Sequence, residues 1–345
     1  MTGQSETSRE TVLVDLALQG GGSHGAFTWG VLDRLLEEPW LKIEAISGTS
    51  AGAMNAAVLV SGFLNGGARG AREALDTYWE RVAESARYSP IQRSIFDRLM
   101  NRWSLDTSPG YVVMDLMSRL VSPYNLNPFG YNPIRSILED CIDFGHLNDA
   151  PIKLFITATS VRTGRGKIFR NKEITPDVLL ASACLPTLFQ AIEIDGEPYW
   201  DGGYAGNPTI SPLVRESEAY DVILVQINPR ERLDTPRSAG DILDRLNEIS
   251  FNAPLMKELR MIALLRQAVD PGTGEGCRWA KMRTHRILTD KLVEFGASSK
   301  LNAEGRFLRV LKDEGRKAAE EFLQSRGDDI GKRSTADLDV LLAEC

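Results

Sequence analysis

The chain has 345 residues, of which 43% are apolar and 25% are charged, and its formal net charge is −7. This composition is that of a globular protein and excludes collagen-like, low-complexity and disordered chains. The negative net charge argues against nucleic acid as a partner. No apolar run reaches the ~18 residues of a membrane span, and the polar start MTGQSETSRE is unlike a signal peptide. We therefore expect a cytoplasmic protein.

The four cysteines are widely spaced along the chain. They form no CxxC pair and show no metal-ligand spacing with the histidines, so we expect reduced thiols and no metal site. The cysteines are Cys141, Cys184, Cys277 and Cys345.

The first part of the chain alternates predicted strands and helices. Residues 11–18 (TVLVDLAL) predict a strand, followed by the glycine-rich segment GGGSHG at 20–25. The next residues, AFTWGVLDRLLEE, have apolar side chains at helical spacing. Residues 43–46 predict a short strand, and SGTSAG then leads into a helix of small residues that ends near residue 62. This βαβα order implies a parallel sheet.

The rest of the chain adds helices and further strands. Residues 68–142 predict mostly helix, and a hairpin is predicted around Asp195-Gly196. Further strands are predicted at 153–160, 167–170, 221–228 and 284–288, and further helices at 176–184, 237–269 and 299–325.

The first candidate site is the sequence Gly48-Thr49-Ser50-Ala51-Gly52. It has the G-x-S-x-G spacing of a nucleophile elbow, in which a tight turn lifts the serine above the end of the sheet. The hydroxyl then lies at the positive end of the following helix. The five-letter pattern also occurs by chance, but the strand before it and the helix after it favour Ser50 as a nucleophile.

The GGGSHG segment also lies where a strand meets a helix. Glycines there expose backbone N–H groups, which suits an oxyanion hole for acyl transfer. The same glycines satisfy the G-x-G-x-x-G pattern of a nucleotide-binding module. That interpretation needs an acidic residue at the end of the second strand, whereas Glu44 lies at its start. An ordinary structural turn is the third interpretation. We favour the oxyanion hole because the loop and Ser50 then follow neighbouring strands.

The local sequence around each candidate does not identify which residue acts as the base that activates Ser50. Among the histidines His24, His146 and His285, the last allows a Ser50–Asp201–His285 triad in chain order. The alternative is direct action by Asp201, which lies where a strand opens into a Gly-Gly turn. An ordinary Asp-Gly turn explains that pattern equally well.

Taken together, the motifs resemble the patatin-like phospholipases and acyl hydrolases. Each motif is weak alone, but all three in this order are highly specific. The resemblance covers residues 11–230, is poorest over 68–142 and fades beyond. The matching motifs are Gly20-Gly21-Gly22-Ser23-His24-Gly25, Gly48-Thr49-Ser50-Ala51-Gly52, and Asp201-Gly202-Gly203 followed by Tyr204 and Asn207-Pro208.

The resemblance implies a three-layer α/β/α fold with a central, mostly parallel sheet and a helical C-terminal extension. We expect a flexible N-terminus over 1–10 and a catalytic domain over 11–230. Within that domain, 68–142 would form a helical lid or acyl-chain region. Residues 231–345 would form a mainly helical region packed on the same domain.

The resemblance also implies a Ser–Asp dyad that needs no histidine, metal or cofactor. Ser50 would be the nucleophile and Asp201 the base, and the backbone of Gly20, Gly21 and Gly22 would bind the oxyanion. The family prefers Arg or Lys where this chain has His24, which weakens the positive charge near the loop. The residues that would support the motifs are His24, Gly25, Gly48, Gly52, Gly202 and Gly203.

The implied substrates are lipid acyl esters: phospholipid, lysophospholipid or neutral ester. Such substrates also imply peripheral contact with a membrane or a lipid aggregate. Residues 91–131 carry many large apolar side chains that suit a lid or an acyl-chain groove, although ordinary core packing explains them as well. An α/β-hydrolase with the His285 triad is the main alternative, but more sheet normally precedes the elbow in that fold.

Overall fold

The computed structural model of the chain describes residues 9–232, 234–268 and 272–340. Most of the N-terminal segment expected to be flexible, and Cys345, lie outside these ranges. Among the described residues, every helix is too short or too polar to cross a bilayer.

An eight-stranded sheet forms the centre of the molecule, in the order β5-β6-β3-β2-β1-β7-β8, with β4 paired to β3 outside this path. The five strands from β3 to β8 along this order are parallel, whereas β4, β5 and β6 are antiparallel to their neighbours. The predicted mostly parallel sheet is therefore confirmed. The strands are β1 Val12–Leu18, β2 Leu41–Gly48, β3 Lys153–Ser160, β4 Gly166–Arg170, β5 Ile192–Ile194, β6 Glu197–Asp201, β7 Asp221–Val225 and β8 Arg283–Ile287.

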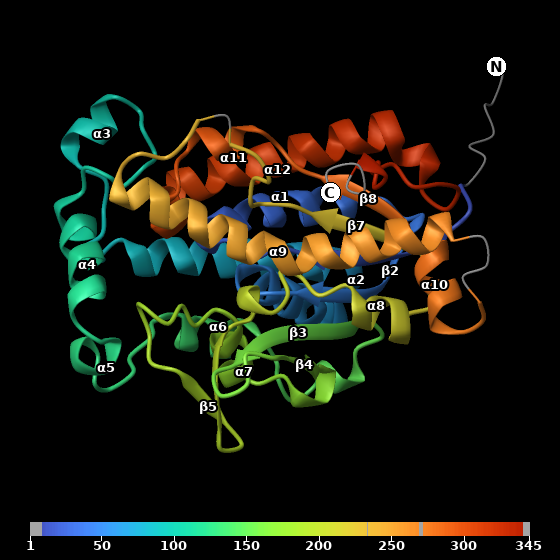
Figure 1. Ribbon diagram of the computed structural model, residues 1–345, viewed down its shortest axis with the longest axis horizontal. Coiled ribbons are helices and arrows are strands. Elements are labelled where there is room, and N and C mark those ends of the chain that lie inside the picture. The colour runs from blue at the N-terminus through green and yellow to red at the C-terminus, as the bar shows by residue number, and fades with distance from the viewer. Residues whose placement is uncertain (1–8, 233, 269–271, 341–345) are drawn as a thin grey trace.

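Two apolar cores cover the two faces of the sheet, because side chains alternate between the faces of a strand. On β1, Leu16 and Leu18 belong to the larger core and Ala17 to the smaller. The result is the three-layer α/β/α architecture (Figure 1). Helices of the larger core are α1 Gly25–Leu35, α2 Ala51–Ala86, α6 Ile134–Cys141, α7 Pro176–Ser182, α11 Lys291–Glu294 and α12 Gly305–Arg326. Helices of the smaller core are α8 Ser211–Glu216, α9 Ala239–Gln267 and α10 Glu275–Lys281.

Segments from beyond residue 230 take part in the same layers. Strand β8 pairs with β7 along its whole length, and α12 packs along α1 (Figure 1). The helical C-terminal region of the predicted fold is therefore present. The division of the chain near residue 230 stays a prediction.

Two helices differ most from their predicted bounds. The helix predicted to end near residue 62 continues as α2 to Ala86, with non-helical backbone at Gly66 and Gly67. The helix predicted from residue 299 begins at Gly305 instead, and a short 3₁₀ turn, η5 Ser298–Leu301, precedes it. That turn becomes part of the candidate site.

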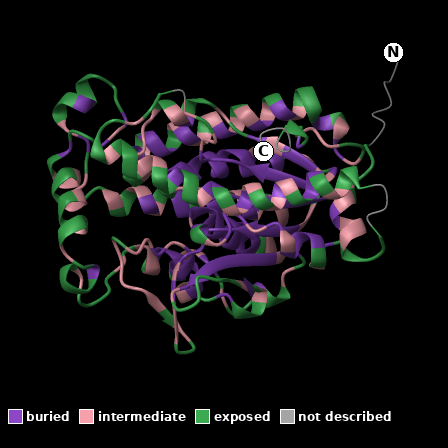
Figure 2. Ribbon diagram, viewed as in Figure 1, coloured by how far each residue is buried: buried purple, intermediate pink, exposed green. Residues whose placement is uncertain are grey.

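The middle segment forms one end of the molecule, where α3 Ile95–Leu99, α4 Pro109–Leu120 and α5 Pro123–Leu126 lie along one edge (Figure 1). No residue of α4 is buried, and this end is largely exposed (Figure 2). Core packing therefore does not account for most of the apolar side chains of 91–131. Exposed apolar residues here are Ile95, Phe96, Leu99, Met100, Val112, Val113, Leu116, Met117, Leu120, Tyr124, Leu126, Phe129 and Tyr131.

Candidate active site

Ser50 lies between the end of β2 and the start of α2, as the predicted elbow requires. Its backbone has φ 54° and ψ −124°, a region that costs a non-glycine residue of order 1–3 kcal/mol. Its N–H donates to Ser182 Oγ at 2.9 Å. A side chain at Gly52 would overlap the carbonyl oxygen of Leu18, so the turn accepts only glycine there. The backbone thus holds the hydroxyl at the N-terminus of a long helix.

Asp201 ends β6 and is only 3% exposed. Burial raises its pKa from 3.8 to about 7, because a charged carboxylate is poorly solvated there. Hydrogen bonds from the Gly203 N–H, at 2.7 Å, and from the Ser50 side chain oppose this shift. The backbone of Gly202 passes so close to Thr157 that a side chain would overlap the Thr157 carbonyl oxygen. This carboxyl group is therefore held beside Ser50 and titrates near neutral pH.

A pocket of about 220 Å³ joins the predicted residues. Ser50, Asp201 and the three glycines of the loop all line it. Its apolar walls include Met114 of α4 together with Leu185 and Leu188. The geometry therefore brings together the three motifs that are far apart in the sequence.

The glycine loop differs from the prediction at Gly20. The N–H of Gly20 donates to Asn207 Oδ1 at 2.7 Å, so it is not free to bind an oxyanion. Gly21 and Gly22 remain candidates. Gly22 has φ +57°, and a side chain there would overlap the carbonyl oxygen of Lys300. The conformation of the loop at Gly22 therefore depends on contact with Lys300, which lies almost 280 residues later in the chain.

A network of amide side chains fixes the same loop, and sequence reasoning missed most of it. Gln19 Oε1 accepts hydrogen bonds from the backbone N–H of Ile227 and of Asn228, both at 2.9 Å. Asn228 Nδ2 donates to the carbonyl oxygen of Gly20 at 2.8 Å. Only Asn207, which follows the Asp-Gly-Gly motif, carried a sequence signal. The network ties the loop after β1 to the chain after β7.

His24 is buried, and burial lowers its pKa to about 3. The imidazole is therefore neutral at physiological pH and supplies no charge to the site. Its Nε2 lies 2.7 Å from Ser299 Oγ, and that hydroxyl donates to the Gly296 carbonyl oxygen. The Ser299 hydroxyl therefore accepts from a protonated Nε2. His24 holds the η5 turn against the loop.

The structure does not bring His285 to Ser50, so the triad hypothesis is wrong. His285 lies within β8, three strands from β2, which is about 14 Å at ordinary strand spacing. Both of its ring nitrogens have partners: Nε2 lies 3.0 Å from Asp221 Oδ1, and Nδ1 lies 3.1 Å from Thr335 Oγ1. His146 is an exposed turn residue beside Asp143.

The nucleotide-binding interpretation requires an acidic residue near the glycine loop, and the structure does not place Glu44 there. Glu44 lies in β2 four residues before the strand ends, and its carboxylate pairs with Lys153 Nζ at 3.0 Å. It does not line the pocket that contains the glycine loop. The loop instead faces the candidate nucleophile.

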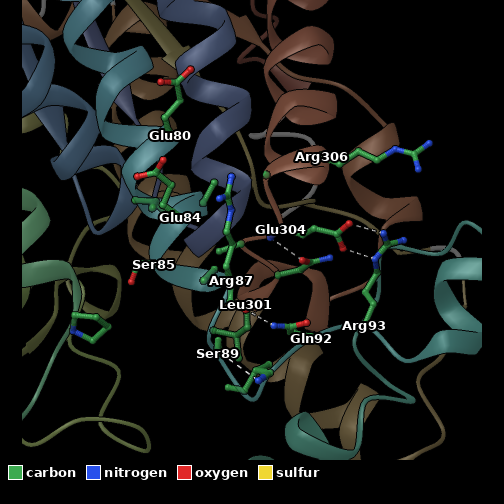
Figure 3. Close-up of a pocket in the computed structure, with 18 of the residues that line it drawn as sticks. Glu80, Glu84, Ser85, Arg87, Ser89, Gln92, Arg93, Leu301, Glu304 and Arg306 are labelled. Carbon is green, nitrogen blue, oxygen red and sulfur yellow. Dashed lines mark hydrogen bonds and ion pairs between the residues drawn. The ribbon is translucent and has the colours of Figure 1, made fainter.

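A larger cavity, of about 880 Å³, lies between the end of α2 and the start of α12. Its walls include Arg93, whose guanidinium pairs with the Glu304 carboxylate at 2.7 Å (Figure 3). None of the three motifs contributes to this cavity. Its size therefore does not make it the candidate active site.

Comparisons with known proteins agree with the predicted family. A family model described as Patatin-like phospholipase matches residues 16–214. No curated protein sequence matches the chain.

Three solved structures resemble the chain at low identity. VipD from Legionella pneumophila is 15% identical, with a TM-score of 0.37, and the match covers 97% of this chain and 79% of VipD. ExoU of Pseudomonas aeruginosa, in complex with SpcU, is 14% identical with a TM-score of 0.28, covering 91% of this chain and 54% of ExoU. A second structure, titled type III effector protein ExoU, is 15% identical with a TM-score of 0.26, covering 96% and 62%. The chain thus spans less than two thirds of the ExoU chains.

Proposed function

Because the chain belongs to the patatin-like phospholipase family, we propose that it hydrolyses lipid carboxylic esters through a Ser50–Asp201 dyad. One observation carries this proposal: a buried carboxyl group with a pKa of about 7 lies against the hydroxyl of an elbow serine. A general base is most effective when its pKa lies near the working pH. Asp201 meets that condition without a histidine.

The proposed reaction has two steps. Ser50 Oγ attacks the ester carbonyl while its proton passes to Asp201, and the alcohol leaves with a proton returned by Asp201. Water then attacks the acyl carbonyl and gives a proton to Asp201. The bond between the acyl carbon and Ser50 Oγ breaks, Asp201 returns the proton to Ser50 Oγ, and the fatty acid is released. The N–H groups of Gly21 and Gly22, which donate to no other described residue, and the positive end of α2 would stabilise the oxyanion in both steps.

The exposed apolar end formed by α3, α4 and α5 supports a lipid surface as the source of the substrate. Phe129 is 95% exposed, and Leu99 and Ile95 are each 80% exposed. Exposed apolar patches of this kind mark contacts with membranes or other partners. Helix α4 also supplies Tyr111 and Met114 to the Ser50 pocket, so an acyl chain leaving a lipid layer at this end would meet the pocket wall. We therefore propose peripheral contact with a membrane or lipid aggregate.

The test is reaction with a fluorophosphonate probe together with hydrolysis of a short-chain ester and a lysophospholipid. We expect wild type to be labelled and active, Ser50→Ala to be unlabelled and inactive, and Asp201→Asn to lose at least ~100-fold in rate. His285→Ala serves as the matched control, because His285 is remote from Ser50. A His285 variant as inactive as the Ser50 variant, yet folded, would contradict the dyad.

A further inference from the structure

Lys300 lies at the candidate site although it belongs to the C-terminal region. Besides the His24 contact, the segment 103–105 holds its turn, η5, and the residue that follows the turn. Ser298 Oγ accepts from the Leu105 N–H at 2.8 Å, and Asn302 Nδ2 donates to the Trp103 carbonyl oxygen at 2.9 Å. The backbone of Lys300 itself lies against Gly22. The position of this lysine is therefore built into the fold.

Lys300 lines the pocket, and its ammonium group has unused hydrogen-bond donors. It lines the same pocket as Ser50 and donates to Asn228 Oδ1 at 2.9 Å. Among the described residues this is its one hydrogen bond, although an ammonium has three donors. The nearby Glu248 carboxylate pairs with Arg232 at 2.6 Å and Arg245 at 3.2 Å, so it is already neutralised. Burial lowers the pKa of Lys300, because an ammonium group is poorly solvated there. A phosphate bound beside it would oppose this shift and favour the charged form.

An acidic and aromatic rim lies at the same pocket. The side chain of Asp244, on α9, forms no ion pair or hydrogen bond with any other described residue. Burial raises its pKa, and the nearby Lys300 opposes this shift. Burial also raises the pKa of Tyr111 to about 12, and the carboxylates of Asp244 and Asp115 add to that shift. The Tyr111 hydroxyl is therefore close to both acids. Phe251 provides a second aromatic ring to the pocket.

We propose that Lys300, Tyr111 and Asp244 form a head-group subsite for zwitterionic phospholipids. Lys300 would bind the phosphate, and Asp244 with the Tyr111 ring would bind the ammonium or quaternary ammonium group, since carboxylates and aromatic faces both attract such cations. In a glycerophospholipid the phosphate is separated by a few covalent bonds from the acyl carbonyl, and the cation lies beyond it. Ser50, Lys300, Tyr111 and Asp244 all line one pocket, so a glycerophospholipid bound there would contact all four. This proposal rests on the proposed function, because that function supplies the lipid ester as the substrate class.

The substrate test compares lipids with identical acyl chains in micelles of an uncharged detergent: phosphatidylcholine, phosphatidylglycerol and diacylglycerol. For Lys300→Met we expect kcat/KM on both phospholipids to fall about tenfold relative to diacylglycerol, because a charged hydrogen bond is lost. Lys300→Arg should restore part of this ratio. For Asp244→Asn we expect the preference for phosphatidylcholine over phosphatidylglycerol to fall about fivefold. Lys257→Met and Asp313→Asn, on exposed faces of α9 and α12, are the matched controls.

A binding test separates the subsite from the chemistry. Calorimetry with Ser50→Ala and glycerophosphocholine should show binding that the added Lys300→Met change weakens about tenfold. If wild type hydrolyses no ester but this binding pattern holds, the proposed function fails and the subsite stands. If Lys300→Met, with an unchanged melting temperature, lowers hydrolysis of all three lipids equally and leaves glycerophosphocholine binding unaltered, the subsite is overturned.

Discussion

At the scale of single residues, burial sets the properties of two carboxyl groups. Asp201 and Asp15 are both buried, and burial raises the pKa of Asp201 to about 7 and that of Asp15 to about 8. Asp221 is the opposite case, because hydrogen bonds from His285 and Arg283 outweigh burial and lower its pKa to about 2. The surroundings, rather than the residue type, therefore decide which carboxyl group can act as a base.

The raised pKa of Asp201 predicts the pH dependence of hydrolysis. The base must be ionised to accept the Ser50 proton, so kcat/KM should rise with pH and level off above about pH 7. A pH–rate profile on a soluble short-chain ester, whose own charge does not change, measures this directly. A profile that is flat between about pH 5 and pH 8 would contradict the assignment of Asp201 as the base.

Asp15 predicts a pH dependence of stability rather than of activity. Its folded-state pKa of about 8 lies above the ordinary 3.8, so the folded protein holds a proton that the unfolded chain has lost. The free energy of unfolding should therefore fall as pH rises from about 4 to 8. Asp15→Asn removes this dependence, so the variant should gain stability relative to wild type as pH rises.

Denaturant unfolding at several pH values measures the effect. Asp313→Asn on the surface of α12 is the control, and its difference from wild type should not vary with pH in the same way. An Asp15→Asn difference that is constant from about pH 4 to pH 9 would mean that Asp15 is already ionised in the folded protein.

At the scale of elements, glycines set how closely helices approach. A side chain at Gly30 of α1 would overlap the Lys312 carbonyl oxygen, and one at Gly315 of α12 would overlap the Phe27 carbonyl oxygen. The two helices therefore contact each other backbone to backbone. This contact holds α12 to the rest of the larger core, and the chain before α12 carries Lys300.

Gly30→Ala should destabilise the protein by about 1–3 kcal/mol or more, because the added methyl group overpacks the contact between α1 and α12. Gly240→Ala is the matched control: its nearest neighbour would be Ser238 Oγ at 3.8 Å, and alanine favours the helix. Denaturant unfolding measures both. A Gly30→Ala variant as stable as Gly240→Ala would show that the two helices can separate without cost.

At the scale of the whole molecule, the apolar end and the pocket are arranged together. Helix α4 carries exposed apolar side chains such as Val113 and Leu120, and it also supplies Met114 to the Ser50 pocket. Figure 2 shows this end exposed, while the buried residues gather around the sheet. The molecule therefore presents a surface suited to lipid beside the pocket proposed to act on it.

A double substitution, Leu99→Ser with Phe129→Ser, should weaken partition into phosphatidylcholine vesicles by at least about tenfold, since burying each side chain is worth roughly 1.5–3 kcal/mol. Vesicle cosedimentation measures it, and the ratio of vesicle to soluble-ester hydrolysis should fall in parallel. Leu243→Ser, an exposed leucine of α9, is the control. Equal partition by the double variant and wild type would exclude this end as the docking surface.

The sequence by itself determined the parallel α/β sheet and the family, and it predicted Ser50 as the nucleophile, whereas Asp201 as the base followed only from the resemblance to the family. These features are local: a strand, a turn that accepts only glycine and a following helix leave a pattern within a few residues. The order of the three motifs then identified the family without any knowledge of contacts.

Only the tertiary structure decided which groups complete the pocket. Lys300 meets Gly22, and Asn207 occupies the Gly20 N–H, through contacts between segments far apart in the chain. No local pattern encodes such contacts, because they depend on how the helices and loops pack. The same is true of the apolar residues of 91–131: their spacing indicates amphipathic helices, but whether protein or solvent covers the apolar face follows from the packing of the whole molecule.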